Sequence, residues 1–127
     1  MQGMTALTLK KIEEIAPYAG PNAIPGMRFR PAARALGVTA WGMNVFEIDP
    51  GCEKYPEHDH QKDGQEEVYV VLRGSATLRS GGRDYLLETG AMIRVPPSEK
   101  RKLTPGPQGA TVLALGATPG KAYEPRR

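Results

Sequence analysis

Prolines and glycines interrupt this chain at short intervals along most of its length. The sequence has 12 prolines and 15 glycines among 127 residues, and they are not gathered into one tract. Both residues end regular secondary structure. Between them lie short segments rich in branched apolar residues, about five residues long and spaced roughly every ten, a pattern typical of antiparallel sandwiches and barrels. We therefore expect an all-β protein.

The expected strands are the apolar segments between these interruptions. The first, Val38 to Ile48, is rich in branched and aromatic residues and ends at Asp49-Pro50-Gly51. Both of its faces are apolar, so we expect it to lie between two layers of protein, with Trp41 and Met43 in the barrel core. The Ser80-Gly81-Gly82 turn predicts a hairpin. The other expected strands are Val68–Leu72, Ser75–Arg79, Arg83–Leu87, Ala91–Val95, Lys100–Leu103 and Thr111–Leu115.

The length fits one domain, 1–127, with a barrel over 38–115. Residues 1–37 form an expected N-terminal arm, irregular from Pro17 to Pro31. Within the arm, Leu7–Ile15 fits an edge strand or one helical turn, and Ala32–Leu36 fits a short helix or a strand. Residues 116–127 are expected to be a surface strap.

Charge and composition argue against several classes of partner. The net charge is +3, with 17 basic and 14 acidic residues intermixed, and only Lys100-Arg101-Lys102 forms a tight basic cluster, so we expect no nucleic acid partner. No apolar run approaches the roughly 18 residues that would span a bilayer. Cys52 is the single cysteine and cannot form an internal disulfide. With no basic region followed by an apolar stretch at the N-terminus, we expect a cytoplasmic protein.

Both histidines of the chain lie close together, at His58 and His60. Alternate side chains of an extended strand share a face, so the two imidazoles are expected to point the same way. Two imidazoles on one face favour a metal ion. The Asp63-Gly64 turn would bring a carboxylate of the next strand beside them, and either Glu66 or Glu67 could be the third ligand.

The stretch Gly51 to Gly74 resembles the first motif of the cupin family, Gly-x5-His-x-His-x3–4-Glu-x6-Gly. By that spacing, the resemblance selects Glu67, six residues before Gly74, over Glu66. Six residues separate Gly51 from His58 in this chain, where the motif has five. Six residues also separate His60 from Glu67, where the motif has three or four. The second cupin motif, Gly-x5-Pro-x-Gly-x2-His-x3-Asn, is matched at Gly90 and Pro96. Ser98, Arg101 and Pro105 stand where the family has Gly, His and Asn.

This resemblance implies a single-domain cupin, a double-stranded β-helix or jelly-roll barrel that commonly forms homodimers through edge strands or exchanged N-terminal arms. It implies a divalent metal, such as Fe, Mn, Ni, Co or Zn, held by three protein ligands, His58, His60 and Glu67. The resemblance says less about the reaction, because cupins include dioxygenases, isomerases, decarboxylases, sensory domains and storage proteins. Our leading expectation is a small polar or anionic substrate with dioxygenase- or isomerase-type chemistry. The alternative is a non-catalytic small-molecule-binding or sensory barrel, with or without a metal.

Arg101 stands where the family has a fourth metal ligand, but a guanidinium has no lone pair to donate to a cation. Directed inward, Arg101 would either bind a substrate carboxylate or phosphate, or pair with Glu67 in place of a metal. Directed outward, it would join a solvated basic edge. Tyr69 shares the face of Glu67 and is expected to line the pocket and bind substrate, to hydrogen-bond a metal ligand, or to lie in the core.

Overall fold

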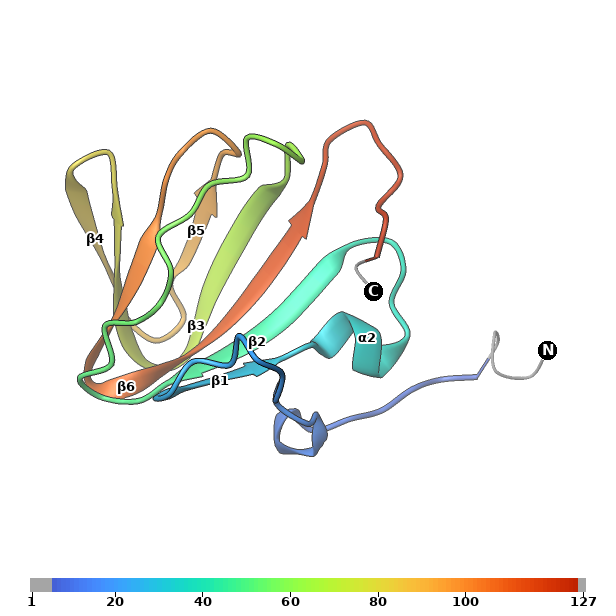
Figure 1. The fold of residues 1–127 in the computed structure, drawn as a ribbon, viewed down its shortest axis with the longest axis horizontal. Coiled ribbons are helices and arrows are strands. Elements are labelled where there is room, and N and C mark those ends of the chain that lie inside the picture. Colours follow the sequence, from blue (N-terminus) through green and yellow to red (C-terminus); the bar gives the residue numbers. More distant parts are fainter. Residues whose placement is uncertain (1–5, 126–127) are drawn as a thin grey trace.

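A computed structural model describes residues 6–125 of the chain. In this range the structure has six strands, a short α-helix and a 3-10 turn (Figure 1). The helical elements are η1 (Ile12–Glu14) and α2 (Ala32–Leu36). The strands are β1 (Met27–Arg30), β2 (Gly42–Ile48), β3 (Glu66–Ser80), β4 (Arg83–Leu87), β5 (Met92–Val95) and β6 (Lys102–Ala117). The predicted all-β class is confirmed.

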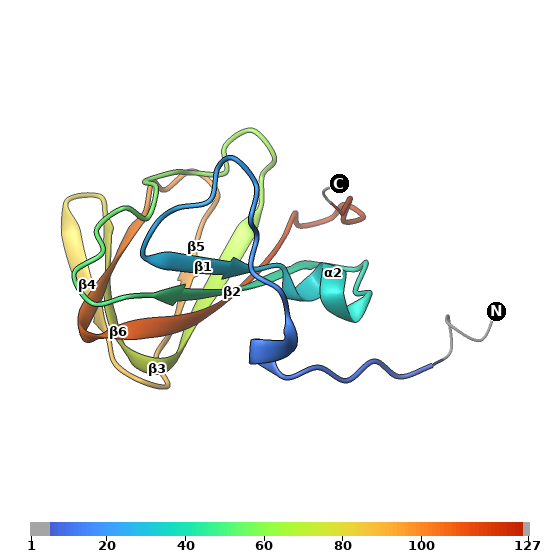
Figure 2. The same ribbon diagram turned by 60° about the horizontal axis from the view of Figure 1, so that its bottom comes forward.

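The two long strands, β3 and β6, pair along most of their length and join two halves of the fold. The strand order is β1-β2-β6-β3-β4, with β5 pairing the first half of β3, and every pairing is antiparallel. The second half of β3 pairs with β4 and with the start of β6. Figures 1 and 2 show the resulting curled sheet, which closes around an interior as a jelly-roll barrel.

The bend between the two halves lies where two glycines meet. The register of β3 with β6 shifts between Val71 and Arg73 and again between Gly74 and Ala76. Gly74 has φ +68, and a Cβ on it would lie 2.1 Å from the carbonyl oxygen of Gly109. Bulges and glycines allow a strand to turn from one sheet into another. Because of this bend, the two halves of the sheet face each other.

The interior is filled by alternate residues of the strands. On β3, Tyr69, Val71 and Leu78 are buried in one cluster. Phe46 and Ile48 of β2 belong to the same cluster. Its remaining buried members are Tyr55, Ala76, Leu87, Val95, Leu103, Ala110, Val112 and Ala114. The face of β3 that carries Tyr69 is also the face of Glu67, so the core and the candidate site share one interior.

β2 is covered on both faces, as the sequence predicts. On the outer face, Val45 packs with Ile15 and Ala32 of the N-terminal region. The strand begins at Gly42, four residues later than expected. The expectation that Trp41 and Met43 lie in the barrel core is wrong: Trp41 is 45% exposed before the strand begins, and Met43 packs against the outer cluster. Alternation assigned the two faces correctly but could not tell which face was the interior.

Several other predicted boundaries also differ. The segments Val68–Leu72 and Ser75–Arg79 are parts of one strand, β3, because the glycine between them bends the strand without ending it. In the same way, the expected strands Lys100–Leu103 and Thr111–Leu115 belong to one strand, β6. This strand begins at Lys102, so Lys100 and Arg101 lie before it. The hairpin strand Arg83–Leu87 is confirmed, and Ala91–Val95 is confirmed from Met92 onward.

The N-terminal region contains more regular structure than expected. Met27–Arg30, within the stretch expected to be irregular, forms the edge strand β1. Ala32–Leu36 is helical and ends at Gly37, which has φ +80. Before η1, Leu7 and Leu9 are 99% and 90% exposed, and Figure 1 shows this part of the arm running away from the barrel. In the C-terminal strap, Tyr123 packs over Gly42.

Candidate metal centre

The two histidines lie on an extended segment that runs beside the chain leading into β6. His58 and Arg101 exchange both backbone hydrogen bonds, with N···O distances of 3.1 and 2.9 Å. The backbone N–H of His60 donates to Pro97 O at 2.8 Å. These bonds fix the segment as a short antiparallel bridge, so His58 and His60 present their rings to the same side.

Glu67 approaches the histidines from β3. It is the register partner of Val95 on one side and of Gly116 on the other. A Cβ at Gly116 would lie 3.2 Å from Glu67 Cγ, so the glycine leaves space for the carboxylate side chain. Glu66 instead forms an exposed ion pair with Arg94. The structure therefore brings Glu67 to the histidines, as the spacing of the motif indicated.

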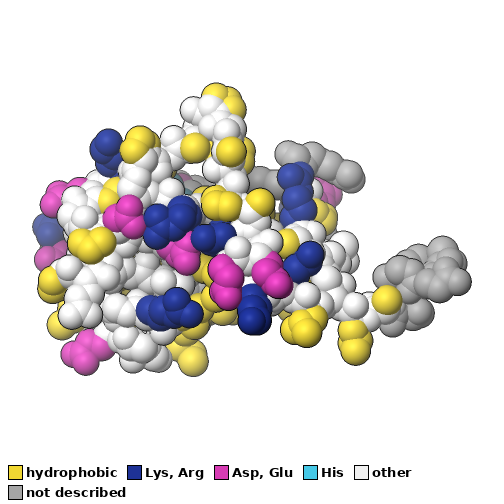
Figure 3. All heavy atoms as spheres, turned by 90° about the horizontal axis from the view of Figure 1, so that it is seen from below, with side chains coloured by type: hydrophobic (Ala, Val, Ile, Leu, Met, Phe, Trp, Pro, Cys, Tyr) yellow, Lys and Arg dark blue, Asp and Glu magenta, His cyan; other side chains and the backbone are white. Residues whose placement is uncertain are grey.

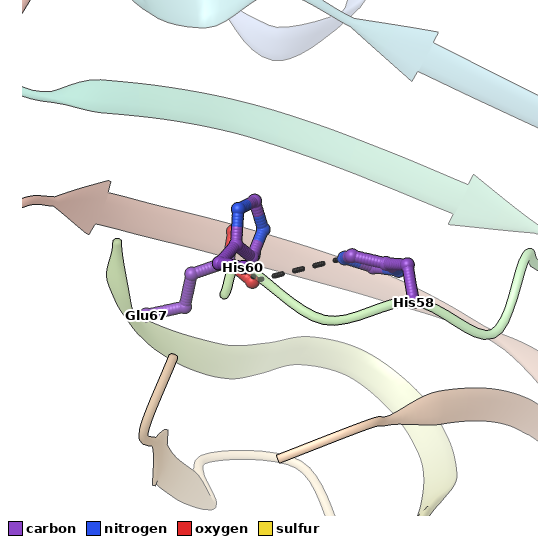
Figure 4. Close-up of side chains that lie close together, drawn as sticks. All are labelled: His58, His60 and Glu67. Atoms are coloured by element: carbon purple, nitrogen blue, oxygen red, sulfur yellow. Dashed lines mark ion pairs between the residues drawn. The ribbon is translucent and has the colours of Figure 1, made fainter. Parts of the chain in front are cut away.

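One atom from each of His58, His60 and Glu67 lies within 4.8 Å of the other two (Figure 4). Glu67 Oε1 is 3.3 Å from Nε2 of His60 and 4.0 Å from Nε2 of His58. Within residues 6–125 no other group of three or more His, Cys, Asp or Glu side chains converges in this way. These three residues could hold a metal ion.

The outer ring nitrogens of both histidines have acceptors. Nδ1 of His58 lies 3.0 Å from Pro56 O, and Nδ1 of His60 lies 3.1 Å from Asp63 Oδ1. A carbonyl and a carboxylate only accept hydrogen bonds, so both Nδ1 atoms carry a proton. In the neutral ring Nε2 then has a free lone pair directed at Glu67. A carboxylate or carbonyl behind the ring is the usual support of a metal-bound histidine.

Arg101 points inward and bonds to Glu67. Its side chain is fully buried, at 0% exposure, and Nη1 donates to Glu67 Oε1 at 2.7 Å. Nε donates to Glu99 O at 3.0 Å and Nη2 to Pro96 O at 2.9 Å. Of the alternatives open from the sequence, the structure therefore shows the ion pair with Glu67. The two backbone acceptors hold the guanidinium in this place.

Tyr69 is the second donor to Glu67. Its hydroxyl lies 2.6 Å from Glu67 Oε1 and 3.4 Å from the hydroxyl of Tyr55. Burial raises the pKa of the Tyr69 phenol far above its ordinary value, and the neighbouring Tyr55 and Glu67 raise it further. Burial likewise raises the pKa of the Tyr55 phenol. Both phenols therefore stay protonated, and Tyr69 acts as a neutral donor to the carboxylate.

The donor set fits a divalent cation, with one opposing feature. Two imidazole nitrogens and one carboxylate oxygen are ligands that suit Fe(II), Mn, Ni, Co and Zn. The Arg101 guanidinium neutralises the Glu67 charge and would repel a cation bound beside it. We expect this repulsion to weaken binding relative to a centre with no such charge. The arrangement can thus act as an open three-ligand metal site or, without a metal, as a pair of imidazoles beside a neutralised carboxylate.

The sequence analysis missed three residues that support the centre. At Asp63 the sequence predicts only a turn, whereas the structure places its carboxylate against His60. Tyr55 is 3% exposed and contacts Tyr69 from inside the core. Gly116 gave no signal, because its role depends on pairing with β3. The prediction that Arg101 and Tyr69 bind substrate stays a prediction.

A cavity of about 1180 Å³ opens at the centre, and His58, His60 and Glu67 all line it. It extends across the inner face of β1 and β2, past Phe29, toward the residues around α2, and Tyr123 of the C-terminal strap contributes to its wall. Pockets that bind small molecules generally have volumes of about 300–1,000 Å³. The centre is therefore accessible to a small organic molecule.

A family profile described as "Cupin domain" matches residues 44–115. This match covers more than half of the chain and contains β3, β4, β5, most of β2 and β6, and the three converging residues. The chain belongs to the cupin family. No curated protein matches the chain significantly.

Solved structures of cupins share the fold at low sequence identity. A sugar phosphate isomerase of the cupin superfamily from Silicibacter pomeroyi has a TM-score of 0.72 and 19% identity, over 87% of this chain and 75% of that one. A "predicted oxalate decarboxylase" from Thermotoga maritima has a TM-score of 0.70 and 20% identity, over 87% and 99%. The Cupin_2 domain of an XRE family transcriptional regulator from Enterobacter cloacae has a TM-score of 0.62 and 16% identity, over 80% and 99%. These similarities show the fold.

Proposed function

We propose that this protein is a metal-binding cupin that acts on a small polar or anionic molecule, with His58, His60 and Glu67 as metal ligands. The observation that carries the proposal is the convergence of these three side chains at one end of a large cavity. Dioxygenase-type and isomerase-type chemistry both fit an open three-ligand centre. The isomerase and the decarboxylase among the similar structures are further support for an enzyme.

A metal bound here would act as a Lewis acid toward a substrate oxygen or as a site for dioxygen. Pro56 O and Asp63 hold the two rings with their Nε2 lone pairs toward the cavity. Arg101 and Tyr69 hold the carboxylate of Glu67 in place and keep its Oε1 hydrogen-bonded. Arg101 and Tyr69 are fully buried and do not line the cavity, so we propose that they contribute to substrate binding through the Glu67 carboxylate that they hold.

The test is metal binding by the purified protein. Metal content is measured by elemental analysis after reconstitution with Fe(II), Mn(II), Ni(II) or Zn(II), and affinity by isothermal titration calorimetry. We expect one ion per chain, and a loss of affinity of about 100-fold or more in the His58→Ala, His60→Ala double variant. A matched Glu57→Ala variant, next to the site in sequence, controls for surface charge. Absence of stoichiometric metal in the wild type for all four ions would refute the proposal.

The second candidate is a non-catalytic barrel that binds a small molecule without a metal. The Arg101–Glu67 ion pair favours it, because the guanidinium already neutralises the carboxylate that a metal would need. The transcriptional-regulator cupin among the similar structures supports a sensory role. Turnover of small acids, sugars and catechols by the metal-loaded protein would favour the enzyme. Binding of one of them without turnover, in metal-free protein, would favour the sensor.

We also propose that the protein is a cytoplasmic homodimer. Among residues 6–125 there is no helix long and apolar enough to cross a membrane, and the single cysteine, Cys52, is free. Leu7 and Leu9 are almost fully exposed on an arm that extends from the barrel, and Figure 3 shows hydrophobic side chains on that projecting part of the molecule. A second copy of the chain is the partner that would cover them.

A further inference from the structure

One wall of the cavity is formed by aromatic rings. Phe29 and Phe46, register partners in β1 and β2, have ring centroids 5.3 Å apart. Phe46 contacts Tyr55 edge-on at 5.6 Å, and Tyr55 contacts His58 at 5.8 Å. The rings of His58 and His60 follow at 5.2 Å. All five side chains line the cavity, so an unbroken series of ring contacts leads from the cavity wall to the candidate metal centre.

Further apolar side chains adjoin this aromatic wall. Phe46 is only 8% exposed, and Phe29, at 36%, offers the more open ring. Met27 and Ala114 also line the cavity. Aromatic rings favour edge-on or offset contact with another ring at these separations. A flat apolar group of a ligand would therefore find partners at Phe29 and Phe46, within the same cavity as the histidines.

The charges of the cavity do not suit a phosphate group. Its charged side chains in the described part of the chain are two cations, Arg34 and Lys62, and three carboxylates, Asp59, Asp63 and Glu67. Both cations lie on exposed residues, where a single charge contributes little. Arg101 is buried and already donates to Glu67 and to two backbone carbonyls. With Glu67 paired to Arg101, the two exposed cations and the two remaining carboxylates of the cavity balance, so without a metal the cavity offers a phosphate dianion no excess of positive charge.

From the aromatic wall and this charge balance, we propose that the cavity takes a neutral or singly charged compound with an aromatic or similarly flat apolar ring, and not a sugar phosphate. The ring lies against Phe29 and Phe46, and an oxygen-bearing group of the ligand faces His58, His60 and Glu67. The proposal rests on the proposed function, since it names the substrate class of the same site. Its evidence, the aromatic wall, is independent of whether a metal binds.

The test compares benzoate, acetate and ribose 5-phosphate by isothermal titration calorimetry, in metal-free and in zinc-loaded protein. Benzoate and acetate share a carboxylate, so the ratio of their dissociation constants isolates the ring. We expect benzoate to bind about tenfold or more tightly than acetate, and more tightly than ribose 5-phosphate. Equal binding of benzoate and acetate, or tighter binding of ribose 5-phosphate, would overturn the proposal.

Two variants test which side chains contact the aromatic ring of the ligand. Phe29→Ala removes an accessible ring and should weaken benzoate binding about fivefold while leaving acetate binding unchanged. Phe46→Leu, which keeps most of the buried volume, should have the same selective effect. Leu86→Ala, exposed on β4 away from the cavity, is the control and should change neither ligand. Circular dichroism melting confirms that each variant is folded. Unchanged benzoate binding in both phenylalanine variants would overturn the proposal.

The metal content of the same samples separates this proposal from the proposed function. If no metal binds but benzoate is still preferred and the preference depends on Phe29, the metal centre is refuted and the aromatic site stands. If zinc binds with the expected stoichiometry but the ring gives no advantage, the metal centre stands and the aromatic site is refuted.

Discussion

At the scale of single residues, the candidate site depends on what surrounds Glu67 Oε1. This atom accepts hydrogen bonds from Arg101 and Tyr69 and lies nearest to the two histidine Nε2 atoms. A carboxylate that is largely removed from water needs such donors, because an unpaired buried charge is strongly destabilising. Arg101 therefore stabilises the centre when no metal is present.

We predict that Arg101→Gln destabilises the metal-free protein by about 3 kcal/mol, since it leaves the Glu67 charge without its cation. The double variant Arg101→Gln, Glu67→Gln should be more stable than the single variant, because it removes the charge as well. Urea denaturation followed by circular dichroism measures both.

Zinc provides a second readout of the Arg101→Gln variant. Removing the guanidinium removes its repulsion of a bound cation, so we expect zinc to bind this variant more tightly than the wild type and to restore part of its stability. If the metal-free Arg101→Gln variant were as stable as the wild type, this account of Arg101 would be wrong.

At the scale of secondary-structure elements, the bend in β3 and β6 positions the site. It separates the part of β3 that carries Glu67 from the part that pairs with β4. The chains cross at Gly74 and Gly109 so closely that a side chain at Gly74 would collide with backbone. A continuous strand can serve both halves of the barrel only because these positions lack a Cβ.

Gly74→Ala should therefore destabilise the fold by about 3 kcal/mol, through both the positive φ and the collision with Gly109 O. Gly82→Ala is the matched control. Gly82 also has a positive φ, +75, but a Cβ there meets nothing within 4 Å, so only the conformational cost of about 1 kcal/mol applies. Chemical denaturation of the two variants measures the difference, and equal losses would refute the role given to the crossing.

The edge strand β1 is tied to β2 by charge as well as by backbone hydrogen bonds. Arg28 and Arg30 both donate to Glu47 Oε1, at 2.9 and 2.8 Å. Burial alone would raise the pKa of Glu47, but the hydrogen bonds and charges of the two arginines outweigh it and lower the pKa below its ordinary value of 4.5.

A carboxylate whose pKa is lower in the folded state stabilises the fold above its unfolded pKa, and this contribution is lost as pH falls through the folded pKa. We predict that wild-type stability, measured by urea denaturation, falls as the pH drops below 4.5. Glu47→Gln should be less stable at pH 7 and should lose less stability on acidification. A parallel pH dependence in the two proteins would show that Glu47 does not contribute.

At the scale of the whole molecule, the N-terminal region has two different roles. Ile15 and Ala32 cover the outer face of β2, which completes the burial of that strand. Before η1, Leu7 and Leu9 are exposed to solvent on a segment that runs away from the barrel. A second copy of the chain that covered these two leucines would bury apolar surface, which is the reason for the proposed homodimer.

We predict that the wild-type protein has the mass of a dimer at tens of micromolar, a concentration range in which specific protein interfaces are generally occupied. The double variant Leu7→Lys, Leu9→Lys should shift it to a monomer without unfolding it. Size-exclusion chromatography with light scattering gives the masses. Exposed Leu86 on β4, replaced by lysine, is the control. A monomeric wild type would refute the proposed role of the arm.

Much of the site could be predicted because its signals are local. His58 and His60 are two residues apart on an extended segment, and the resemblance to the first cupin motif, through its spacing from Glu67 to Gly74, selected the third residue. Local alternation also marks Met27 and Phe29 against Arg28 and Arg30, a signal for β1 that the many glycines and prolines around it obscured.

The sequence by itself predicted an all-β fold and two histidines on one face, because strand alternation and turn residues act over a few positions, and the resemblance to the cupin motif added the jelly-roll barrel and Glu67. Only the tertiary structure decided the direction of Arg101. Its contact with Glu67 joins residues 34 positions apart and depends on how the segment before β6 aligns with the histidines. The aromatic wall has the same origin, since Phe29, Phe46 and Tyr55 meet only through the pairing of β1 with β2 and the closure of the barrel.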